Sequence, residues 1–124
     1  MHLCRLLYKI VFLLCFWALP SLADQFLMGT EDVPLMDGMT YSVDETFSFE
    51  NEDGRLYFSK TFISLKPQKI WDFYEKTLPQ LGWQKNAAGV FERESDILRI
   101  GVIDEDYHSE QKTTVIFELI TKSK

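Results

Sequence analysis

Cysteine is almost absent from this chain. The two that it has, Cys4 and Cys15, both lie within the first 23 residues. If that segment is removed, disulfide bonds, cysteine nucleophiles and cysteine-ligated zinc are excluded from the remaining protein. Beyond the same segment, His108 is the sole histidine. Glycine-rich phosphate loops, paired histidine ligands and nucleophile elbows are missing too, so we expect no cofactor.

The chain also lacks an apolar run that could span a membrane as a helix. Its longest run, Ile10–Ala18, has about nine residues, whereas a spanning helix needs roughly 18 to 20. Arg5 and Lys9 precede this run, and the small residues of Ser21–Ala23 follow it. This pattern is typical of a secretory signal peptide over residues 1–23. We therefore expect cleavage between Ala23 and Asp24, a periplasmic or secreted protein, and no membrane span after cleavage.

Basic residues are fewer than acidic ones, at 13 against 19. Loss of the signal peptide would remove Arg5 and Lys9 and leave every acidic residue in place. Nucleic acids are bound mainly through lysine and arginine, so this balance argues against a nucleic-acid partner. The acidic excess is typical of a surface that keeps a protein soluble.

The length after residue 23 suits a single domain, and its first part differs from the rest. Residues 24–41 show neither helical nor strand periodicity and are interrupted by glycine and proline. The segment nevertheless contains Val33, Leu35, Met36, Met39 and Tyr41. We expect an extended lead-in over 24–41 that contributes to the core of a single domain over 42–124.

Alternating residues and turn signals predict the elements of that domain. Strands over 45–50 and 55–65 flank the turn Asn51–Gly54 and form a hairpin. Pro67 opens a helix that Pro79 should end near Thr77 or Leu78. Residues 83–85 then lead into a strand over 90–94, and strands over 97–104 and 113–121 follow. The order β-β-α-β-β-β predicts a two-layer α+β fold with one helix on a twisted antiparallel sheet.

Four short blocks of sequence together resemble a known family. The blocks are DVPLMDGM at Asp32–Met39, GRL at Gly54–Leu56, FYEKTLPQLGW at Phe73–Trp83 and FERE at Phe91–Glu94. This combination is similar to a family of small exported bacterial proteins of unassigned function. The resemblance implies an envelope location and a compact α+β fold, and it implies no catalytic residue. Asp37 stands where the family pattern has proline, which implies a less rigid turn.

A single helix would leave one face of the sheet uncovered, and that face is a candidate contact surface. We expect Tyr57, Ile63, Ile103 and Ile116 to lie on it together with Ile97, and Trp71 to be exposed at the edge of the helix stripe. This surface predicts a non-catalytic protein that binds an envelope protein or another cell-envelope component. The oligomeric state stays open, including cover of the face by a second copy.

Two other functions remain as alternatives. Asp104, Asp106, His108 and Glu110 alternate along one loop and could hold a divalent cation or support a histidine general base. Their spacing differs from that of calcium loops, and a solvated loop is the favoured interpretation. A small hydrolase or metal-dependent enzyme would use this loop. A carrier of an apolar ligand would instead use the aromatic-rich layer between helix and sheet.

Overall fold

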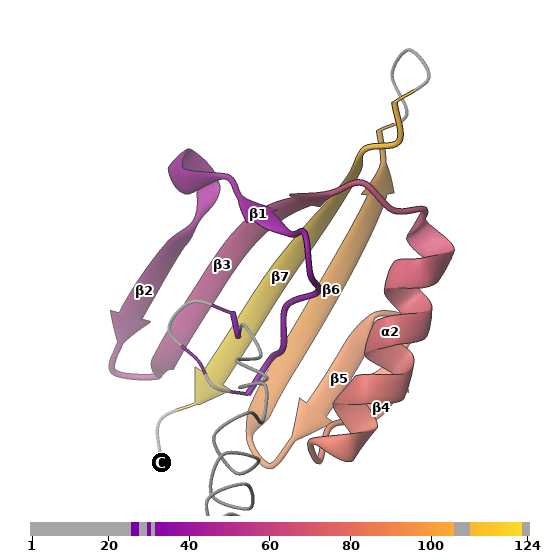
Figure 1. The fold of residues 1–124 in the computed structure, drawn as a ribbon. Helices are drawn as coiled ribbons and strands as arrows, with labels where there is room; N and C mark the ends of the chain where they lie inside the picture. Colours follow the sequence, from indigo (N-terminus) through magenta and orange to yellow (C-terminus); the bar gives the residue numbers. More distant parts are fainter. Residues whose placement is uncertain (1–25, 28–29, 31, 106–109, 123–124) are drawn as a thin grey trace, which may run out of the picture.

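The computed structural model describes residues 26–27, 30, 32–105 and 110–122. In this part of the chain, one α-helix packs against an antiparallel sheet of seven strands (Figure 1). The strands are β1 (Thr40–Tyr41), β2 (Phe47–Asn51), β3 (Gly54–Ile63), β4 (Gln84–Ala87), β5 (Val90–Arg93), β6 (Asp96–Asp104) and β7 (Thr113–Lys122). The helix is α2 (Pro67–Gln80), and a short 3-10 turn, η1 (Val43–Glu45), joins β1 to β2. The predicted α+β class is confirmed.

The order of the strands across the sheet is β1-β3-β7-β6-β5-β4, and β2 also pairs with β3. The sheet contains two strands more than the sequence predicted. They are the short β1, which pairs with β3, and β4, which forms a hairpin with β5. Both β1 and β2 pair with the same edge of β3, one after the other. The last pair of β1 is Tyr41–Thr61, the first pair of β2 is Phe47–Phe58, and η1 lies between them. The edge is thus interrupted, whereas β3 pairs with β7 without a register shift.

The helix extends to Gln80 instead of ending near Thr77 or Leu78. Pro79 lies in the last turn, where its missing amide removes only one helical hydrogen bond. The Gly82 amide donates to the Pro79 carbonyl at 3.2 Å, and the Trp83 amide donates to the Leu78 carbonyl at 3.1 Å. With Gly82 at a φ of +91°, these bonds form a Schellman motif. Among the described residues, no helix has the length and apolar content required to cross a membrane.

Two segments cover the same face of the sheet and enclose the core. The buried residues Ile70, Tyr74 and Leu78 of α2 cover one part of that face. The lead-in crosses the rest beside the helix (Figure 1), and its Val33 and Met39 are buried. The Tyr74 hydroxyl joins the two segments by donating to the Pro34 carbonyl at 2.9 Å. The lead-in is therefore an integral part of the core, as its apolar residues indicated.

Candidate functional site

The side of the sheet that faces away from α2 and the lead-in is the strongest candidate site. In β7, Val115, Phe117 and Leu119 are buried against the helix, so the alternating Ile116 and Ile120 point the other way. Directly opposed residues share a face of the sheet, so the strand register identifies the rest of this surface. We call it the open face, and its residues are Phe47, Phe49, Leu56, Phe58, Lys60, Phe62, Val90, Glu92, Ile97, Arg99, Ile103, Thr114, Ile116, Glu118, Ile120 and Lys122.

The expected contact surface is divided between the two faces. Ile103 and Ile116 lie on the open face, as predicted. The placement of Tyr57 and Ile63 there is wrong, since Ile63 is only 5 % exposed in the core and both pair with β7 residues that point toward the helix. Trp71 is half-buried against the core from α2, so it is not part of the open face. Sequence reasoning missed the phenylalanines of β2 and β3 as surface residues.

Three of those phenylalanines, Phe47, Phe49 and Phe58, concentrate apolar surface at one end of the open face. Phe49, Leu56 and Ile120 are successive cross-strand partners, and Ile97 extends the row to a fourth strand. Beside this row, the rings of Phe47 and Phe58 stack with centroids 5.1 Å apart. Phe47 is 55 % exposed and Phe49 is 59 % exposed. A soluble protein seldom leaves such a contiguous aromatic surface to water, and surfaces of this kind mark binding sites.

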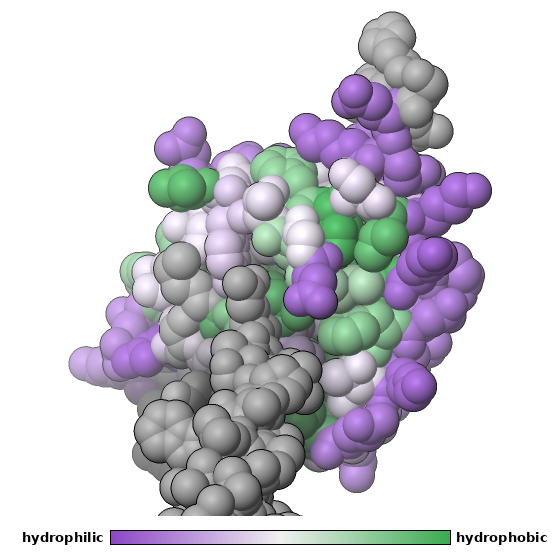
Figure 2. All heavy atoms as spheres, viewed as in Figure 1, coloured by the Kyte–Doolittle hydropathy of each residue, from purple (hydrophilic) through white to green (hydrophobic). Residues whose placement is uncertain are grey.

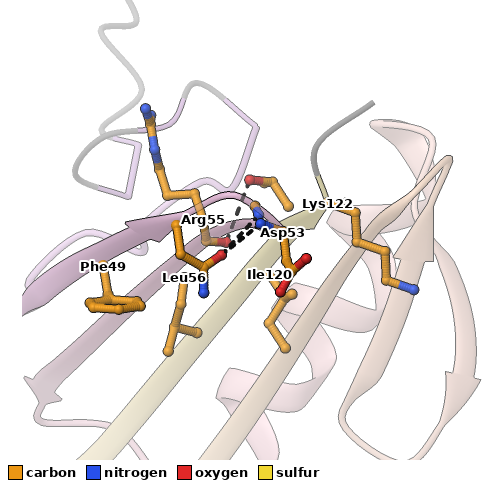
Figure 3. Close-up of a pocket in the computed structure, with 9 residues that line it drawn as sticks. Phe49, Asp53, Arg55, Leu56, Ile120 and Lys122 are labelled. Atoms are coloured by element: carbon orange, nitrogen blue, oxygen red, sulfur yellow. Dashed lines mark hydrogen bonds between the residues drawn. The ribbon is translucent and has the colours of Figure 1, made fainter.

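A hollow of about 280 Å³ lies at the same end of the face. Figure 3 shows Phe49, Leu56 and Ile120 projecting to one side of the sheet, whereas Arg55 projects away from them. The turn beside the hollow is held by the Asn51 Oδ1 atom, which accepts hydrogen bonds from the amides of Asp53 and Gly54 at 2.9 and 3.2 Å. The hollow thus has an apolar floor and a braced rim, and it could receive an apolar side chain.

Charged side chains surround the other end of the open face. Lys60 Nζ lies 3.0 Å from Glu45 Oε2, and this hydrogen bond, with a second from Ser42, lowers the pKa of Glu45. The ammonium groups of Lys60 and Lys112 lie 5.8 and 4.5 Å from the centroid of the Phe62 ring. Cations over aromatic faces are attracted to the ring quadrupole. This end of the face is therefore amphipathic rather than purely apolar.

The acidic loop gives no assembled site in the described residues. Asp106 and His108 lie outside those residues. Asp104 accepts a hydrogen bond from the Gln111 amide at 3.0 Å, and Glu110 is exposed. Within the described chain, no group of three or more His, Cys, Asp or Glu side chains could hold a metal ion.

A second apolar surface lies on the covered side, at the seam between the lead-in and α2. Figure 2 shows hydrophobic residues gathered along this seam. A groove of about 430 Å³ runs there. Its lining comes from both segments and from the chain that leads into the helix, and it comprises Pro34, Leu35, Met36, Asp37, Leu65, Phe73 and Thr77. The groove is the site that an apolar-ligand carrier would use.

Comparisons with protein-family models, with curated proteins and with solved structures found no match for this chain. The resemblance of its four sequence blocks to small exported proteins therefore stays a prediction. Two of those blocks have clear structural roles. The block that ends in Leu78–Trp83 forms the end of the helix, and Asp32–Met39 anchors the lead-in on the core.

Proposed function

We propose that this chain is a non-catalytic exported protein that binds another protein, or a component of the cell envelope, through its open face. The observation that carries the proposal is an aromatic-rich sheet face with no covering layer among the described residues. Burying one phenylalanine side chain contributes about 1.5 to 3 kcal/mol. A partner that covers Phe47, Phe49 and Ile103 would gain this contribution at several positions in one contact.

The proposed location rests on the start of the sequence. The basic residues, short apolar run and small residues of 1–23 support export and cleavage near Ala23. The resemblance to small exported bacterial proteins supports the same location. An acidic, thiol-free domain suits a binding protein in the periplasm or outside the cell.

Affinity capture from an envelope extract tests the proposal. The bait is the purified protein, and the test variant carries Phe49→Ser and Ile103→Ser, two open-face positions that are largely exposed. Leu81→Ser is the matched control, because Leu81 is a 39 % exposed hydrophobic residue at the end of α2. We expect the wild type and the control to capture the same partner and the double variant to lose it. Equal capture by all three proteins would refute the open face as the binding surface.

Carriage of an apolar small molecule is a second candidate, favoured by the groove at the seam of the lead-in and α2. Native mass spectrometry of freshly purified protein would then show an added mass. Thr77→Trp would place a large ring at the lining of this groove and should abolish that added mass. A wild-type protein without any added mass would argue against the carrier.

A further inference from the structure

We infer that the partner of the open face is a second copy of this chain, and that two open faces pack against each other in a two-fold symmetric dimer. This inference rests on the proposed function, since it identifies the protein that the open face binds. Three observations support it: the size of the face, the balance of its charges and the shape of a bare sheet.

The size of the open face matches what a stable dimer requires. The ten-residue strands β3 and β7 are each about 34 Å long, and strands lie about 4.8 Å apart. Together with β6 and the shorter β2 and β5, they present an area on the order of 600 to 800 Å². A standard protein interface buries about 800 Å² on each partner.

The charge of the open face differs from that of the whole chain. Among its strand side chains, Lys60, Arg99 and Lys122 are basic, and Glu92 and Glu118 are acidic. Three flanking groups contact the face, namely the basic Lys112 and the acidic Glu45 and Glu105, which makes four charges of each sign. The chain as a whole carries 19 acidic and 13 basic residues. Two copies of such an acidic protein repel each other over most of their surfaces. They approach without that repulsion where the charges balance, which is at the open face.

The shape of the face also suits a second sheet. Two twisted sheets of the same hand pack face to face about 10 Å apart, with their strands about 30° from alignment. The resulting dimer has α2 and the lead-in of each copy on the outside and both open faces inside. In a two-fold contact the same patch serves both partners, so every substitution on the open face acts twice.

Sedimentation equilibrium of the exported protein, purified after cleavage near Ala23, measures the association directly. Between roughly 0.1 and 100 μM, we expect the mass to rise from that of one copy to that of two. Phe49→Ser and Ile103→Ser should each raise the dissociation constant at least about tenfold, and Leu81→Ser should leave it unchanged. A protein that stays monomeric over the whole range overturns the inference. So does a dimer whose dissociation constant the open-face variants leave unchanged.

Charge reversal gives a second test that does not depend on removing apolar surface. Arg99 and Glu118 are cross-strand partners on the open face. Arg99→Glu makes the face acidic and Glu118→Arg makes it basic, so each variant alone should dissociate. An equimolar mixture should recover dimers that contain one copy of each variant. A mixture that remains monomeric contradicts packing through this face.

The outcomes separate this inference from the proposed function. A monomeric protein that captures an envelope partner through Phe49 and Ile103 disproves the second copy and preserves the binding function. If these substitutions change neither self-association nor capture, both proposals fail.

Discussion

Asp37 occupies the second position of a tight turn that connects the buried part of the lead-in to β1. The Met39 amide donates to the Met36 carbonyl at 3.2 Å, and Gly38 has a φ of +89°. A glycine with positive φ at the third position is typical of a type II turn, in which proline is favoured at the second position. This turn therefore favours proline at the position of Asp37.

Asp37→Pro should therefore stabilise the protein by about 0.4 to 1 kcal/mol, because proline restricts the unfolded chain more than the folded turn. The Asp37 side chain is exposed, so its replacement should remove little packing. Urea unfolding measures the change. Gly38→Ala is the control. Its added Cβ would have no atom within 4 Å, so only the strain of the positive φ should lower the stability. A loss of stability in Asp37→Pro would show that the turn is of another type.

Tyr74 predicts how stability depends on alkaline pH. Burial raises the pKa of Tyr74 far above its ordinary value of 10.0. Above pH 10 the unfolded chain releases this proton and the folded chain retains it, so stability falls by up to about 1.4 kcal/mol per pH unit. Tyr74→Phe removes this dependence. At pH 7 the variant should be less stable by about 1 to 2 kcal/mol, because the Pro34 carbonyl loses its donor.

The stability difference between wild type and Tyr74→Phe should therefore shrink as the pH rises above 10. Denaturant unfolding at pH 7, 9 and about 10.5 measures it. A difference that stays constant over this range would mean that Tyr74 ionises equally in both states.

At the scale of elements, Arg93 of β5 holds the lead-in to the rest of the fold. Its guanidinium lies 2.9 Å from an Asp32 carboxylate oxygen and donates to the Leu81 carbonyl at 3.1 Å. The same group lies 4.6 Å from the centroid of the Trp83 ring. One side chain thus connects the lead-in, the end of α2 and the strand hairpin.

Arg93→Ala should loosen the lead-in without unfolding the sheet. We expect the free energy of unfolding to fall by about 1 kcal/mol, because the ion pair is partly exposed and the contact with the ring adds only a modest stabilisation. Hydrogen exchange should accelerate at the Leu27 amide, which donates to the Val33 carbonyl at 2.7 Å, and should stay slow in β6 and β7. Arg93→Lys should restore only part of the protection, because lysine lacks the planar fork. Unchanged exchange at Leu27 in the alanine variant would contradict this role.

Local patterns predicted the elements better than their ends. Pro67 correctly predicted the start of α2, and the turn Asn51–Gly54 correctly predicted the first hairpin. An end near Thr77 or Leu78 is two or three residues too early, because proline usually stops a helix and Pro79 does not stop this one. The hydrogen bonds of the Schellman motif bridge the proline, and that motif depends on Gly82 rather than on Pro79.

The sequence of one strand does not show which face of the sheet is buried. In β3 both alternating sets contain apolar residues, so the strand itself does not show which set is buried. The register with β7 decides it, because Tyr57 and Ile63 oppose Leu119 and Thr113 on the covered side. This pairing joins residues far apart in the sequence. The aromatic open face, which is the candidate site, is therefore identified by the strand pairing and not by the sequence of any single strand.

At the scale of the whole molecule, both faces of the sheet carry apolar residues, and the described segments cover only one of them. The covered face is completed by the chain itself, through α2 and the lead-in. The open face carries aromatic and aliphatic residues beside charged ones, and no described segment covers it. The fold therefore resembles half of a larger sandwich, and its stability should depend on whether the second half is present.

Thermal unfolding at two protein concentrations distinguishes the roles of the faces. Dimerisation stabilises the folded state by mass action, so the wild-type Tm should be higher at about 200 μM than at about 1 μM. Phe49→Ala should keep a near-normal Tm at the low concentration and lose the increase, since Phe49 is largely exposed in a single copy. Ile100→Val, on the buried face of β6, should lower the Tm at both concentrations by about 4 to 8 °C and keep the increase. If Phe49→Ala instead lowered the Tm equally at both concentrations, its ring would stabilise the single copy, and the open face would belong to the fold rather than to an interface.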